Sequence, residues 1–116
     1  MFFNNVCAVD TPTGGKDFRH LNAVCIKSLQ DHAWKGEMGE LDANQILLTE
    51  EAGTYLTRKE SEKVILSFLS KEGRVEHHPI RFDGVNFKNY APNLIGNTVP
   101  VLIETIVGKD AKKLAL

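Results

Sequence analysis

The sequence is poor in cysteine and in long apolar runs, and each shortage excludes a class of protein. It has only two cysteines, Cys7 and Cys25. Two cysteines make neither a disulfide framework nor a cysteine metal cluster, so we expect two reduced thiols in a cytoplasmic protein. No stretch approaches the roughly 18 apolar residues of a membrane span. The start of the chain lacks the basic region of a secretory signal, and none is expected.

A large charge of one sign is also missing. The formal net charge is −1, which gives no general attraction for nucleic acid or for a membrane surface. Recognition of an anion must therefore be local. No Ser-His-Asp or Cys-His set is spaced for nucleophilic chemistry, and no glycine-rich phosphate loop precedes a helix. The sequence therefore predicts a protein that is not an enzyme and uses no cofactor.

Metal binding is not expected either. His77 and His78 are the most suggestive pair, but they are neighbours on a predicted strand. Neighbouring side chains on a strand point to opposite faces, so the two rings cannot share one ion. We predict no metal site.

What the chain does contain is one ordered set of helix and strand patterns. Helical spacing of apolar residues, strand patterns and turn residues predict helices over about 16–30, 40–48 and 97–107 and strands over about 53–58, 63–69 and 74–80. Asn97 is expected to cap the last helix. The run 64–69 is apolar on both faces, which is typical of a covered central strand. These patterns predict an α+β fold in which a central antiparallel sheet has one helix on each face and an extra N-terminal helix.

Arg58 stands out within this pattern. In the run GTYLTR, residues 53–58, Leu56 and Arg58 point to the same face, and Leu56 is a core residue. A buried arginine is costly without a partner, so removing Arg58 is expected to change the stability of the free domain little. Its guanidinium fork fits a carboxylate or a phosphate. Two interpretations are open: an anion anchor, or a structural ion pair with Glu37, Glu60 or Glu62.

The order of these pieces resembles the Src-homology-2 (SH2) domain, the phosphotyrosine-binding module. The motifs that carry the resemblance are Trp34-Lys35-Gly36-Glu37-Met38, the GTYLTR strand with Thr57 where valine is usual, the apolar strand 64–69, Val75-Glu76-His77, and the last helix. The resemblance covers about Trp34 to Ile106. We therefore divide the chain into an N-terminal extension with a helix, residues 1–31, and an SH2-like domain, residues 32–116.

The resemblance implies a site and a class of partner. The implied phosphotyrosine-binding residues are Arg58, Lys59, Ser61, Lys63 and His77, and His78 lines the peptide groove. The implied partners are tyrosine-phosphorylated proteins or peptides, with no nucleic acid and no membrane. SH2-like domains with short specificity loops occur in effectors of intracellular bacterial pathogens. The chain is compatible with that origin, which would place it in the host cytosol.

Three positions depart from the family pattern. Glu40 stands where a basic residue usually begins the first helix. Pro79 replaces a usual lysine or arginine, and Glu60 a usual serine. These changes remove positive charge and motivate an alternative, a degenerate SH2-like fold that acts as a phosphate-independent interaction module.

The specificity side departs further. Only residues 108–116 follow the last predicted helix. This stretch is too short for a large loop and a returning strand, so the sequence predicts a shallow specificity pocket and low sequence specificity.

Overall fold

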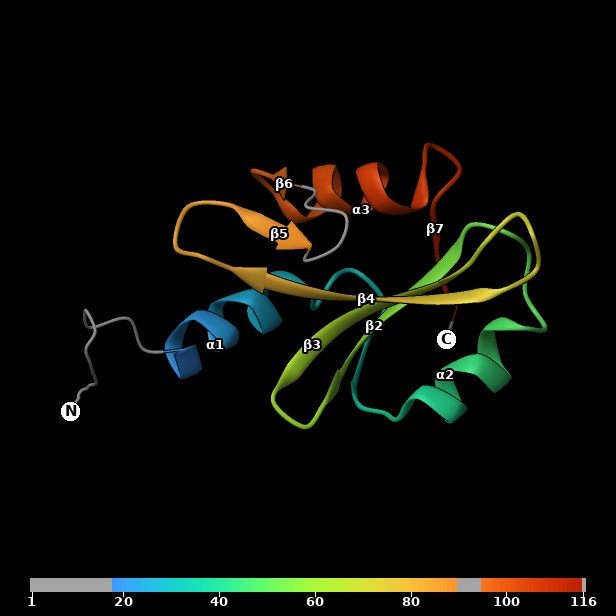
Figure 1. Cartoon of the computed structure of the whole chain (residues 1–116), viewed down its shortest axis with the longest axis horizontal. Helices are drawn as coiled ribbons and strands as arrows, with labels where there is room; N and C mark the ends of the chain where they lie inside the picture. The colour runs from blue at the N-terminus through green and yellow to red at the C-terminus, as the bar shows by residue number, and fades with distance from the viewer. Residues whose placement is uncertain (1–17, 90–94, 116) are drawn as a thin grey trace.

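The computed structural model describes residues 18–89 and 95–115, and within them the chain forms three helices and a seven-stranded mixed sheet (Figure 1). The elements are α1 (Phe18–Ser28), β1 (Trp34–Glu37), α2 (Glu40–Leu47), β2 (Thr54–Glu60), β3 (Lys63–Leu69), β4 (Val75–Phe82), β5 (Phe87–Asn89), β6 (Ile95–Gly96), α3 (Val99–Val107) and β7 (Lys112–Lys113). The predicted α+β class is confirmed. Cys7 and the start of the first predicted helix lie outside the described residues.

The centre of the sheet is an antiparallel meander, as the sequence predicts. Strands β2 and β3 pair with Arg58 opposite Ile65, and β3 pairs with β4 so that Ser67 is opposite His77. The edges differ from the expectation of a purely antiparallel sheet, because β1 and β7 both pair with β2 in parallel. Both parallel pairings join segments that are distant in sequence, so no local pattern reveals them.

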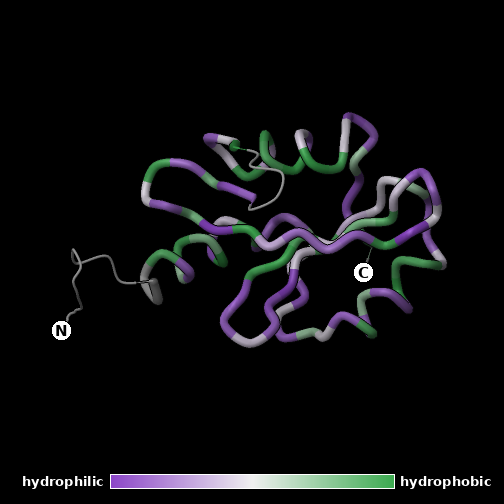
Figure 2. Tube along the Cα trace, in the orientation of Figure 1, coloured by the Kyte–Doolittle hydropathy of each residue, from purple (hydrophilic) through white to green (hydrophobic). Residues whose placement is uncertain are grey.

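The two faces of the sheet are covered separately, with α2 on one side and α3 on the other (Figure 1). Strand β3 serves both faces: Val64, Leu66 and Phe68 enter the apolar cluster that includes α3, and Leu69 enters the cluster under α2. This double burial explains why the run lacks alternation. In Figure 2 hydrophobic residues gather along β3 and α3, whereas the turns at the ends of the meander are hydrophilic.

Helix α1 adds its apolar side to the α3 face. Cys25 and Leu29 are fully buried in the same cluster as Leu66 and Ile80, so α1 shares the core of the sheet. Burial raises the pKa of the Cys25 thiol to about 12, which keeps it protonated at neutral pH. The division at residue 31 stays a prediction.

Two local expectations change. The cap of α3 is Thr98, whose side chain accepts a hydrogen bond from the backbone N–H of Val101 at 3.4 Å, and not Asn97. A returning strand also exists, contrary to expectation. The connection between α3 and β7 is only residues 108–111, which leaves enough chain for β7 to pair with β2. Just before β2, the backbone N–H of Lys112 donates to the Gly53 carbonyl at 3.0 Å.

Candidate functional site

The site begins with the position of Arg58 on β2. Alternation along the strand places Arg58 on the α2 face together with Leu56, which packs against Ala43 and Leu47 of α2. The side chain of Arg58 is 1% exposed. The sequence-based assignment of its face is thus correct, and the guanidinium lies inside the domain.

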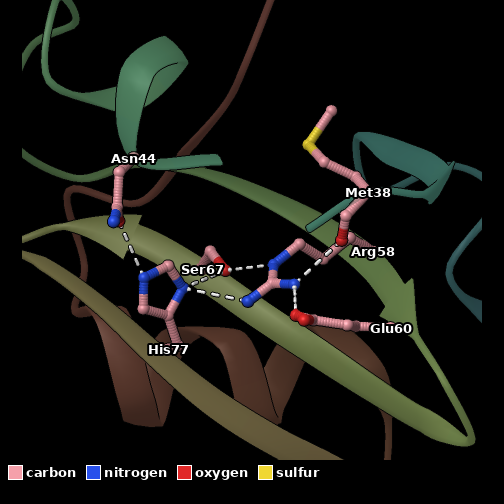
Figure 3. Close-up of polar contacts among 6 residues, drawn as sticks. All are labelled: Met38, Asn44, Arg58, Glu60, Ser67 and His77. Atoms are coloured by element: carbon pink, nitrogen blue, oxygen red, sulfur yellow. Dashed lines mark hydrogen bonds and ion pairs between the residues drawn. The ribbon is translucent and has the colours of Figure 1, made fainter. Parts of the chain in front are cut away.

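Four hydrogen bonds hold this guanidinium (Figure 3). Nε–H donates to Ser67 Oγ at 3.0 Å, and Nη2–H to His77 Nδ1 at 3.2 Å. Nη1 donates to the Met38 carbonyl at 2.9 Å and to Glu60 Oε1 at 2.7 Å. A guanidinium has five N–H donors, so one Nη2–H is left without an acceptor in the described part of the chain. The buried charge is therefore well satisfied, with one donor to spare.

The hydrogen-bond partners of His77 define its tautomer. Nδ1 accepts from Arg58 and lies 2.7 Å from Ser67 Oγ, so Nε2 carries the proton and donates to Asn44 Oδ1 at 2.8 Å. Burial, and then the positive charge of Arg58, lower the pKa of His77 below its usual value. The ring is thus neutral at neutral pH, and the positive charge of this hydrogen-bond network comes from Arg58.

A cavity of about 370 Å³ opens above this network. Its lining residues are Glu40, Arg58, Glu60, Ser61, Lys63, Ile65, His77 and Pro79. Two cations, Arg58 and Lys63, face two carboxylates, Glu40 and Glu60. Among the described residues Lys63 has no ion-pair partner, so its ammonium is available at the rim.

Four of the five predicted phosphotyrosine-binding residues meet in this cavity: Arg58, Ser61, Lys63 and His77. Lys59 does not line it, because the alternation of β2 turns its side chain the other way, and its ammonium lies 3.5 Å from Glu37. The turn between β2 and β3 is only Ser61 and Glu62, with φ 56° at Ser61. Few backbone N–H groups are therefore available there for an anion.

His78, the predicted groove residue, faces the other side of β4. Its ring stacks on Phe68 at a centroid distance of 5.6 Å, and its Nε2 lies 3.2 Å from Glu76 Oε1. Phe68 also lines a second hollow of about 320 Å³, between the start of β4 and the residues after α3. His78 thus lies beside a hollow on the far side of the strand from Arg58.

The sequence interpretation missed three partners of the site. Ser67 carried a signal, since it is the one polar residue in the apolar run 64–69 and hairpin pairing brings it close to Arg58. Asn44 and the Met38 carbonyl carried none, because α2 and the end of β1 reach Arg58 only through the fold.

No group of three possible metal ligands occurs among residues 18–89 and 95–115. None of the helices described is long and apolar enough to cross a membrane.

Comparison with known proteins gives likeness in structure only. No family sequence profile matches the chain, and no curated protein is significantly similar to it. The SH2 domain of a CRK/CRKL homologue from Monosiga brevicollis aligns with a TM-score of 0.56 at 19% identity, over 70% of this chain and 83% of that one. The VAV1 SH2 domain complexed with a tyrosine-phosphorylated peptide from SLP76 gives 0.52 at 21%, over 66% and 57%. The human VAV1 SH2 domain alone gives 0.50 at 18%, over 76% and 71%. Likeness at such identities concerns the fold, and we conclude that this chain has an SH2-like fold.

Proposed function

We propose that this domain is a non-catalytic module that binds tyrosine-phosphorylated proteins or peptides, with Arg58 as the anchor of the phosphate. The single observation that carries the proposal is a buried guanidinium, 1% exposed, among the residues that line an open cavity. Folding alone gives little reason to keep an arginine at a core-facing position, whereas an anionic ligand does.

The chemistry of the cavity suits a phosphate ester. A phosphate on tyrosine carries about −1.5 to −2 charges and three strong acceptor oxygens. Nη2 of Arg58 has a spare N–H, and the N–H that Nη1 gives to Glu60 would complete a bidentate pair if that carboxylate moved. Lys63 and Ser61 stand at the rim to meet further oxygens. Because Arg58 lies at the floor, the long phosphotyrosine side chain reaches it better than phosphoserine does.

A paired titration tests the proposal. A degenerate phosphotyrosine peptide library and its unphosphorylated twin are titrated against the parent domain and against Arg58→Lys. We expect binding only with phosphate, and a loss of about 2–5 kcal/mol in the variant, because an ammonium cannot form the bidentate fork. Lys59→Ala is the matched control, since Lys59 carries the same charge on the same strand and faces away from the cavity.

The second candidate is a degenerate module that binds a partner without phosphate. The observation in its favour is that a carboxylate, Glu60, already holds Arg58, while Glu40 adds a further negative charge and Pro79 adds no positive one. This candidate predicts equal affinity for the phosphorylated and unphosphorylated libraries. Such a result would exclude the first proposal.

Two finer parts of the proposal rest on the sequence resemblance. We propose low specificity for the residues that flank the phosphotyrosine, with His78 in the peptide groove. We also propose a cytoplasmic location, which is the host cytosol if the chain is a bacterial effector.

A further inference from the structure

Glu60 lies where a ligand anion would meet Arg58. The two residues are two positions apart on β2 and so share its α2 face. The Glu60 carboxylate accepts from Arg58 Nη1 at 2.7 Å and lines the same cavity. We infer that Glu60 is an internal competitor, a carboxylate that occupies part of the phosphate position and must leave before a ligand binds fully. This inference rests on the proposed function.

Glu60 is the acceptor of Arg58 that can leave most easily. The Met38 acceptor is a backbone carbonyl, Ser67 is fully buried, and the His77 ring is held on its other side by Asn44 at 2.8 Å. The Glu60 side chain is 47% exposed, so its carboxylate can turn into water, where it is well solvated. Hydration of the exposed carboxylate offsets part of what it loses when it leaves the guanidinium. A phosphate ester brings more charge and more acceptor oxygens than the carboxylate it displaces.

Competition by Glu60 would lower the apparent affinity for anions by a factor that can be measured. When a binding-competent state is only partly populated, the apparent affinity falls by that fraction. The factor depends on how often Glu60 holds Arg58 and not on which anion arrives. It therefore lowers the affinity of every anion equally, so that only the strongest binders, phosphate esters, remain detectable. Simple charge repulsion differs, because it penalises a doubly charged anion more than a singly charged one.

The experiment uses phenyl phosphate and phenyl sulfate, which share a ring and differ in charge. Both are titrated by NMR into the parent and into Glu60→Gln, with Glu60→Ala as a second variant. We expect either variant to raise both affinities by a common factor of about ten, the value if Glu60 holds Arg58 nine-tenths of the time. Glu62→Gln is the matched control. It removes the same charge two residues further on, from a side chain that is exposed and does not line the cavity, and we expect a change below about twofold.

Two further readouts separate competition from a structural role. In the parent, addition of phenyl phosphate should move the Glu60 carboxyl carbon signal towards that of a solvated carboxylate. The melting temperature of unliganded Glu60→Gln should be equal to or below that of the parent while anion affinity rises. A merely structural residue would weaken stability and binding together.

The outcomes decide between the inference and the proposed function. If the parent binds phenyl phosphate but Glu60→Gln and Glu60→Ala bind it no better, the inference is wrong and the proposed function stands. A gain confined to phenyl phosphate would indicate repulsion and also overturn competition. If no variant binds either anion, the proposed function fails and the inference fails with it.

Discussion

At the scale of single residues, Arg58 is a charged side chain inside the domain, and its hydrogen-bond partners decide what it contributes to folding. A charge facing the core is destabilising in isolation, yet here Met38, Ser67 and His77 accept its hydrogen bonds within the domain. The sequence shows the charge but not its acceptors, which is why sequence reasoning expects little loss of stability when Arg58 is removed. Because these acceptors satisfy the buried charge, we now expect the removal of Arg58 to destabilise the domain.

We therefore predict that Arg58→Ala destabilises the free domain. The variant leaves a cavity and deprives Met38, Ser67 and His77 of their donor, which should lower the free energy of unfolding by about 2–4 kcal/mol. Urea unfolding of the parent and the variant measures the difference. Lys63→Ala removes the same charge from the exposed rim and should change stability by less than about 0.5 kcal/mol. Equal stability of Arg58→Ala and the parent would show that the network contributes nothing.

The neutral state of His77 makes a second prediction at the residue scale. Burial and Arg58 lower the pKa of His77, and burial and Lys113 lower that of His32. Just below the usual histidine value, about 6.5, the unfolded chain thus binds more protons than the folded one. Stability is full above that pH and falls as the pH drops towards the folded-state pKa values.

Thermal melts between about pH 7.5 and 5 test this dependence, since aspartates and glutamates are still mostly ionised there. His77→Gln and His32→Gln should each flatten the curve in part, and the double variant should flatten most of it. A parent domain whose melting temperature rises as the pH falls to about 5 would contradict the neutral state of His77 in the folded protein.

At the scale of the elements, Gly53 joins β2 to the residues before β7. Its φ is 92°, and a Cβ there would lie 2.7 Å from the Asp110 carbonyl oxygen. Gly53→Ala should therefore strain the backbone and push the connection 108–111 away, at a cost of about 2–4 kcal/mol. Gly73 is the matched control: its φ is 81°, but nothing lies within 4 Å of the added Cβ. Gly73→Ala should cost only about 1 kcal/mol, and similar melting temperatures for the two variants would refute the clash.

At the scale of the whole molecule, features that leave a local pattern in the sequence could be predicted, whereas pairings between distant segments could not. The helices, the meander and the face of Arg58 follow from local pattern, because burial of one face leaves a period in the sequence and burial of both faces leaves a continuous apolar run. The parallel pairings of β1 and of β7 with β2, the Asn44–His77 contact and the approach of the Met38 carbonyl to Arg58 arise only on folding. The sequence identified Glu60 both as a departure from the SH2 pattern and as a candidate ion-pair partner of Arg58. Only the geometry shows it on the guanidinium and in the cavity at once.

The last prediction follows from the proposed function and concerns the residues that flank the phosphotyrosine of a bound peptide. A ligand anchored at Arg58 and crossing β4 would next meet His78, Phe68 and the hollow beside α3. The connection 108–111 is short, so it lines that hollow with only three residues, Gly108, Lys109 and Asp110. Phosphotyrosine peptides that differ only by uncharged side chains at the next three positions should therefore vary in affinity by less than about tenfold, about 1.4 kcal/mol.

Fluorescence titration of a small peptide set measures this spread, with unphosphorylated twins as the baseline. Ile106→Ala, which enlarges the hollow, should leave all the affinities nearly unchanged if the hollow reads no side chain. A spread of about a hundredfold in the parent, reduced in Ile106→Ala, would instead identify the hollow as a specificity pocket. In that case Arg58 would supply only part of the binding free energy, and the identity of the partner would be encoded beside α3.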